Sequence, residues 1–130
     1  MSAYDALAFS YDALTYDVDY EQNILFWQKL LTRFHVKPES VLDLACGTGS
    51  ASVLLAQQGY RVLGVDCSEQ MLTVAAEKAA ELENPPYFIK QKMQRLRLPE
   101  PVDAVLCGLD GQVGILYVLA ESRRLSFRHC

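Results

Sequence analysis

The sequence lacks several features that mark specialised classes of protein. Its four cysteines include no CxxC pair, so no metal site is expected, and they are predicted to be reduced thiols filling small buried positions. No apolar run approaches the roughly 20 residues of a membrane helix. The first residues carry no basic segment, so no signal peptide is predicted and a cytoplasmic location is expected. Acidic side chains outnumber basic ones, 16 to 12, which argues against general nucleic-acid binding.

What the sequence does contain is a regular alternation of short apolar runs and helical patterns. With 51% hydrophobic residues among 130, it predicts one folded domain. Strands that alternate with helices indicate parallel βαβ units in a doubly wound α/β sheet. We predict helices over 21–34, 50–58 and 68–82, and strands over 41–45, 61–65, 87–89 and 102–107.

The candidate site follows the first two predicted strands. Gly47 and Gly49 form a tight turn after the first strand, where the backbone can approach a ligand closely. Asp66 comes 19 residues after Gly47, at the end of the second strand. Because ligands of parallel sheets bind beyond the carboxyl ends of the strands, a carboxylate there can accept both hydroxyls of a ribose.

Two residues separate the possible nucleotide ligands. Dinucleotide-binding turns have a third glycine where this chain has Ser52. Asp43, just before the turn, would repel a pyrophosphate but would attract an ammonium group, directly or through a water. S-adenosylmethionine combines an ammonium group, a ribose and an adenine without a phosphate, so it fits better than a nicotinamide cofactor.

Residues 41–49 (VLDLACGTG) resemble motif I of class I S-adenosylmethionine-dependent methyltransferases, and 65–72 (VDCSEQML) are similar to the segment that follows in that superfamily. The tyrosine-rich start resembles the N-terminal helices of its small-molecule and ubiquinone-biosynthesis-like branches. The resemblance implies that the glycines approach the methionine end, Asp66 holds the ribose, Met71 packs on the adenine, and the N-terminal tyrosines cover the cofactor. The implied cofactor-binding residues are Asp43, Ala45, Cys46, Gly47, Thr48, Gly49, Asp66, Cys67, Met71, Met93, Tyr11 and Tyr20.

The resemblance weakens toward the C-terminal part of the sequence. Lys92 stands where the family often has an acid that meets the adenine amino group, and an ammonium group cannot accept that bond. The family fold has seven strands, of which about four are expected here. We therefore predict an incomplete Rossmann-like core over 37–110, with an N-terminal helical cap over 1–36 and a divergent tail over 111–130.

The expected activity is methyl transfer from S-adenosylmethionine to an unidentified acceptor, with a small molecule favoured. No general base is identifiable, and Asp110 is the candidate for a polar residue on the substrate side. The alternative is a protein that binds S-adenosylmethionine, or another partner, without turnover. Val105 and Leu106 on a terminal fourth strand would also leave an apolar edge open to self-association.

Overall fold

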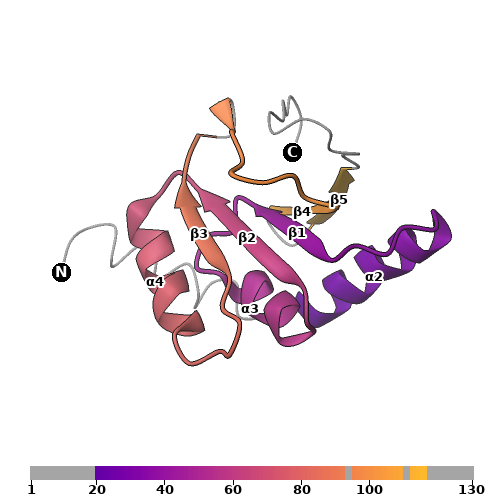
Figure 1. The fold of residues 1–130 in the computed structure, drawn as a ribbon, viewed down its shortest axis with the longest axis horizontal. Helices are drawn as coiled ribbons and strands as arrows, with labels where there is room; N and C mark the ends of the chain where they lie inside the picture. Colours follow the sequence, from indigo (N-terminus) through magenta and orange to yellow (C-terminus); the bar gives the residue numbers. More distant parts are fainter. Residues whose placement is uncertain (1–19, 93–94, 110–111, 117–130) are drawn as a thin grey trace.

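The computed structural model describes residues 20–92, 95–109 and 112–116, which form a five-stranded sheet with helices packed against it (Figure 1). The strand order is β3-β2-β1-β4-β5; the first four strands are parallel, and β5 is antiparallel to β4. The elements are α2 (Tyr20–Arg33), β1 (Ser40–Leu44), α3 (Ser50–Gln57), β2 (Arg61–Asp66), α4 (Glu69–Ala79), β3 (Tyr87–Lys90), β4 (Ala104–Leu109) and β5 (Gln112–Leu116). The predicted alternation is confirmed, with α4 ending three residues earlier than expected.

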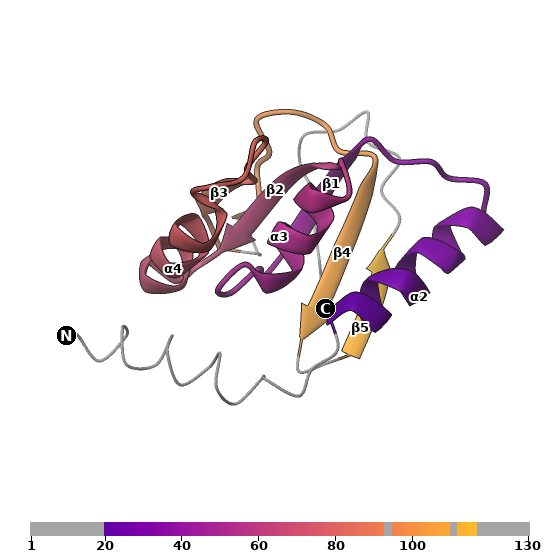
Figure 2. The ribbon, with the colours of Figure 1, turned by 90° about the horizontal axis from the view of Figure 1, so that it is seen from below.

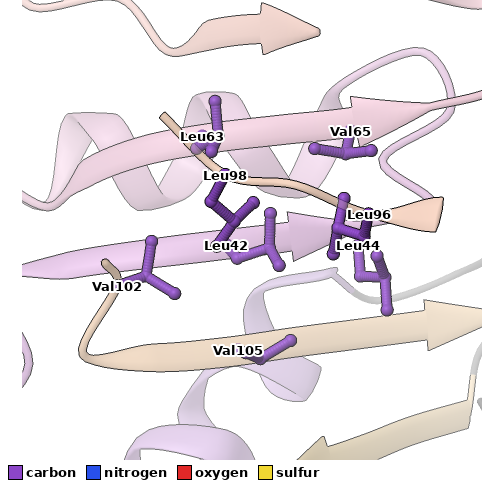
Figure 3. Close-up of a cluster of buried hydrophobic side chains, with 8 residues drawn as sticks. All are labelled: Leu42, Leu44, Leu63, Val65, Leu96, Leu98, Val102 and Val105. Carbon is purple, nitrogen blue, oxygen red and sulfur yellow. The ribbon is translucent and has the colours of Figure 1, made fainter. Parts of the chain in front are cut away.

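The two faces of the sheet are covered differently. Helices α2, α3 and α4 all lie on one face (Figure 2). The buried residues of that face are Ile24, Trp27, Leu31, Val41, Leu55, Val62, Ala104 and Leu106. The other face is covered by the extended segment before β4 (Figure 3), and its buried residues are Leu42, Leu44, Leu63, Val65, Leu96, Leu98, Val102 and Val105. Apolar side chains on both faces explain why the central strands read as continuous apolar runs.

Helix α2 is fixed to the sheet by its tryptophan. The Trp27 indole is fully buried, and its Nε1 donates a hydrogen bond to the carbonyl oxygen of Val105 in β4, at 3.1 Å. The helix ends before Pro38, because His35 adopts a left-handed backbone with φ of 61° and the N–H of Val36 bonds back to the carbonyl of Leu31. This terminal motif stops the helix without help from the proline.

The four predicted parallel strands are confirmed, and β5 adds a fifth, antiparallel strand within the predicted tail. Leu109 of β4 pairs with Gln112 of β5, so the sequence Asp110-Gly111 connects them. Asp-Gly between two apolar runs is a common hairpin connection, and this signal could have predicted β5. The pairing also makes β4 an interior strand, so the expectation that Val105 and Leu106 lie on an exposed edge was wrong.

None of the helices in the described ranges combines the length and the apolar character that a bilayer span requires.

Candidate functional site

The turn after β1 has an unusual backbone. Ala45, Gly47 and Gly49 all have positive φ, at 57°, 56° and 82°. Gly tolerates this left-handed region, whereas alanine adopts it at a penalty of about 1–2 kcal/mol. The turn is held by the N–H of Cys46, which donates to the carbonyl of Val65 in β2 at 2.9 Å. Strain of this kind in a non-glycine residue is often found at functional sites.

Asp66 at the end of β2 joins the two predicted halves of the site. Its Oδ2 accepts a hydrogen bond from the N–H of Gly47, and its Oδ1 accepts one from the N–H of Ser68, both at 2.9 Å. The structure thus brings the glycine turn and the distal acid together, as expected from the sequence. A carboxylate has about four lone-pair positions, so two backbone bonds leave acceptor capacity for further donors.

Asp43 is buried within β1, with only 3% of its surface exposed. The hydroxyl of Ser52, in the first turn of α3, donates to Asp43 Oδ2 at 2.6 Å. Burial raises the pKa of Asp43 to about 7; the Ser52 bond opposes this rise and the nearby Asp66 carboxylate adds to it. Asp43 can therefore change its charge near neutral pH, which the sequence did not reveal.

Gly49 packs against α4 more tightly than expected. A Cβ at this position would lie 2.7 Å from the Cβ of Ala75 and 3.4 Å from the ring of Phe88. The sequence predicted close approach of Gly49 to a ligand, but in the structure the position of a Cβ is already occupied by α4. The glycine allows the turn and α4 to approach each other, because no other residue has room at this contact.

Thr48, also predicted to bind the cofactor, is buried and directs its hydroxyl to α4. The ammonium group of Lys78 donates to Thr48 Oγ1 at 3.0 Å and to Ser50 Oγ at 3.1 Å. Lys78 thus ties α4 to the turn and to the start of α3. Sequence reasoning missed this residue, since nothing local to it indicates a partner 30 positions away.

The remaining predicted residues surround the same edge of the sheet. Met71 is half-buried in the first turn of α4, where its N–H bonds to the Ser68 hydroxyl that caps the helix. Cys46 is half-buried, and burial raises its thiol pKa above the usual range. Cys67 is exposed, so the expectation that the cysteines fill buried positions was wrong for this residue. Tyr20 is the first residue of α2, and the start of that helix lies near the carboxyl end of β4 (Figure 2).

Tyr11, Met93 and Asp110 lie outside the described residues. Close to Met93, Lys92 is exposed. The amide of Gln91 exchanges two hydrogen bonds with the backbone of Arg97, each at 2.8 Å. These bonds close the loop after β3 and direct the following segment onto the sheet.

Comparison with known proteins agrees with this geometry. The "Methyltransferase domain" family model matches residues 41–125, which is more than half of the chain. "Putative methyltransferase YqeM" of Bacillus subtilis is 33% identical over 119 residues, covering 92% of this chain and 42% of that protein. A putative methyltransferase of Geobacillus is 35% identical, and the match covers 92% of this chain and 47% of that protein. The chain thus spans less than half the length of these relatives.

Solved structures show the same fold. An S-adenosylmethionine-dependent methyltransferase from Clostridium acetobutylicum superposes with a TM-score of 0.70 at 29% identity, over 84% of this chain and 45% of that one. Magnesium protoporphyrin IX methyltransferase from Synechocystis, solved with bound S-adenosylmethionine, superposes with a TM-score of 0.54 at 32% identity. The match covers 68% of this chain and 43% of that one. The region matched by the family model contains both the left-handed turn and Asp66, and the chain therefore belongs to the methyltransferase domain family.

Proposed function

We propose that this chain binds S-adenosylmethionine at the carboxyl ends of β1 and β2. We further propose that it acts as a methyltransferase domain that transfers the methyl group to a small-molecule acceptor. The observation that carries the proposal is the contact between Asp66 and Gly47. It joins the two sequence features that the ligand needs, the close-approach turn and the ribose-binding acid, in one place.

The residues at this edge fit the chemistry of the ligand. Asp66 keeps acceptor capacity for the ribose hydroxyls. Asp43 offers a carboxyl group near the turn, which suits an ammonium group and disfavours a pyrophosphate. Met71 is available to pack on the adenine, and the exposed Cys67 directly follows β2. Met93, Tyr11 and Tyr20 are proposed to complete the site.

When bound, S-adenosylmethionine supplies a methyl group on a sulfonium centre, which is already a good leaving group. The chain would therefore contribute mainly orientation of the ligand and exclusion of water. Further relatives of the chain carry the names of methyltransferases of glycine, magnesium protoporphyrin and demethylmenaquinone. Because these acceptors are all small but chemically different, we propose only the small-molecule class.

Calorimetric titration with S-adenosylhomocysteine tests the binding proposal. Asp66→Ala should weaken affinity roughly 30- to 150-fold, or about 2–3 kcal/mol, because charge-assisted hydrogen bonds to the ribose are lost. Asp103→Asn is the matched control, since Asp103 also accepts two backbone N–H groups but lies at the opposite edge of the sheet. It should bind like the parent. Equal affinity of Asp66→Ala and parent would contradict the ribose assignment.

The alternative to this activity is a protein that binds S-adenosylmethionine without turnover. Radiolabelled S-adenosylmethionine separates the two cases, because binding and methyl transfer to an added small-molecule extract can be counted independently. Retention of the label with no transferred methyl would favour the binding protein. Transfer to an extract component would establish the enzyme.

A further inference from the structure

Asp43 and Ser52 form a buried, hydrogen-bonded pair, and the sequence did not predict this contact between them. Asp43 is 3% exposed and Ser52 is 0% exposed, and a 2.6 Å hydrogen bond joins their side chains. A hydroxyl–carboxylate contact this short is typical of a charge-assisted bond. Ser52 comes from α3 and Asp43 from β1, so the bond also fixes the helix start to the central strand.

The Ser52 hydroxyl is the main group that stabilises the ionised form of Asp43, and the backbone N–H of Ser52 adds to its effect. The sheet neighbours of Asp43 are Gly64 in β2 and Leu106 in β4, and neither carries a titratable group. The charged group that acts on Asp43 from β2 is Asp66, which opposes ionisation, as burial does. The Cys46 thiol follows in the turn and is neutral, because burial and the two carboxylates raise its pKa.

We propose that Ser52 is a positioning residue that holds Asp43 in the orientation and charge state required by the ammonium group of S-adenosylmethionine, so that binding depends on pH near neutrality. This inference rests on the proposed function. It assigns to Ser52 a part in ligand binding, although the residue is fully buried within the described structure and is separated from the ligand by Asp43.

The direction of the effect follows from charge. A bound ammonium group favours the ionised carboxyl, so affinity should fall as pH falls through the pKa of Asp43, which is about 7. Ligand binding below that pH should release a proton from Asp43. Without the Ser52 hydroxyl, ionisation becomes harder, and the fall in affinity should move to higher pH.

The first test needs no ligand. Carbon NMR of the protein labelled at aspartate carboxyls follows the ionisation of Asp43 directly, with Asp43→Asn assigning the signal. Ser52→Ala should raise the midpoint by about one pH unit, and Ser52→Thr, which keeps the hydroxyl, should restore it. Ser50→Ala is the matched control, because this serine bonds to Lys78 instead of Asp43.

The second test is the affinity for S-adenosylhomocysteine, which carries the same ammonium group, measured from pH 5.5 to 9. Ser52→Ala should bind about fivefold more weakly near pH 7, about tenfold more weakly at pH 5.5, and equally well at the alkaline end, while Asp43→Asn should show no such pH dependence. Titration in buffers of different ionisation enthalpy should reveal the released proton in the parent.

The outcomes separate the inference from the proposed function. An unshifted Asp43 midpoint in Ser52→Ala, or a loss of affinity by the same factor at every pH, would overturn the inference, since a purely structural serine gives that pattern. Absence of binding by the parent at every pH would overturn the proposed function, and the inference with it. If Ser52→Ala does not fold, a pH-independent parent affinity with no proton release would still refute the inference.

Discussion

One aspartate lies near each end of β1, and the two differ in burial and in the direction of their pKa shifts. At the carboxyl end, Asp43 is buried, and burial raises its pKa to about 7. At the other end, Asp103 of the segment before β4 is exposed to solvent, and its Oδ2 accepts the N–H groups of Glu39 at 2.9 Å and Ser40 at 3.1 Å. These bonds lower the pKa of Asp103.

The same contrast holds for the glycines at the two ends of α3. Gly49 at the start is pressed against Ala75, whereas a Cβ on Gly59 after the helix would meet nothing within 4 Å. The carboxyl-end edge thus combines a buried carboxyl, a left-handed alanine and a crowded glycine. The opposite edge satisfies its polar groups with exposed hydrogen bonds, and its left-handed residue, His35, ends a helix. A buried carboxyl and a crowded glycine beside a strained turn are typical of a site selected for binding, with the core supplying the stability.

The largest expected effect comes from the crowded glycine. Gly49→Ala should lower the free energy of unfolding by roughly 2–4 kcal/mol, because the new Cβ meets Ala75 and the backbone φ is +82°. Gly59→Ala is the control with positive φ but open space, and about 1 kcal/mol is expected. Urea unfolding measures both. Equal losses of stability in the two variants would contradict the prediction. They would mean that α4 moves to make room for the added methyl group at Gly49.

A smaller change should relieve the strained turn. Ala45→Gly should raise the free energy of unfolding by roughly 0.5–1 kcal/mol, since glycine adopts a φ of 57° freely. Ala76→Gly makes the same chemical change on the exposed side of α4, where it should lower stability by about 1 kcal/mol. Thermal and urea unfolding of the pair give the sign. A loss of stability in Ala45→Gly would show that the turn stores no strain at this residue.

The smallest expected effect is at the exposed aspartate. Asp103→Asn should lower stability at pH 7 by less than about 1 kcal/mol, because exposed charge interactions are screened. Since folding lowers the pKa of Asp103, its contribution is present above the unfolded value of about 4 and is lost as pH falls through the folded one. Unfolding at pH 7 and pH 3 should therefore give a difference between variant and parent that shrinks at low pH. Glu100→Gln, an exposed neighbour, controls for the loss of one charge, and a constant difference would contradict the assignment.

The sequence by itself determined the order of strands and helices, the glycine turn and the acid at the end of β2. Each depends on local chemistry: apolar periodicity, the conformational freedom of glycine, and the preference of serine for a helix start, as at Ser68 before α4. These signals act over a few residues, so they can be read along the chain.

Only the tertiary structure decided what surrounds these features. The pairing of β5 with β4, the contact of Gly49 with Ala75, the reach of Lys78 to Thr48 and the bond from Ser52 to Asp43 all join separate elements. The sequence showed Ser52 only as a missing glycine, and it gave no means of knowing that its hydroxyl would meet a buried carboxyl. Burial and distances between side chains are defined only once the elements pack together. They determine the pKa of Asp43 and the space available for a side chain at Gly49.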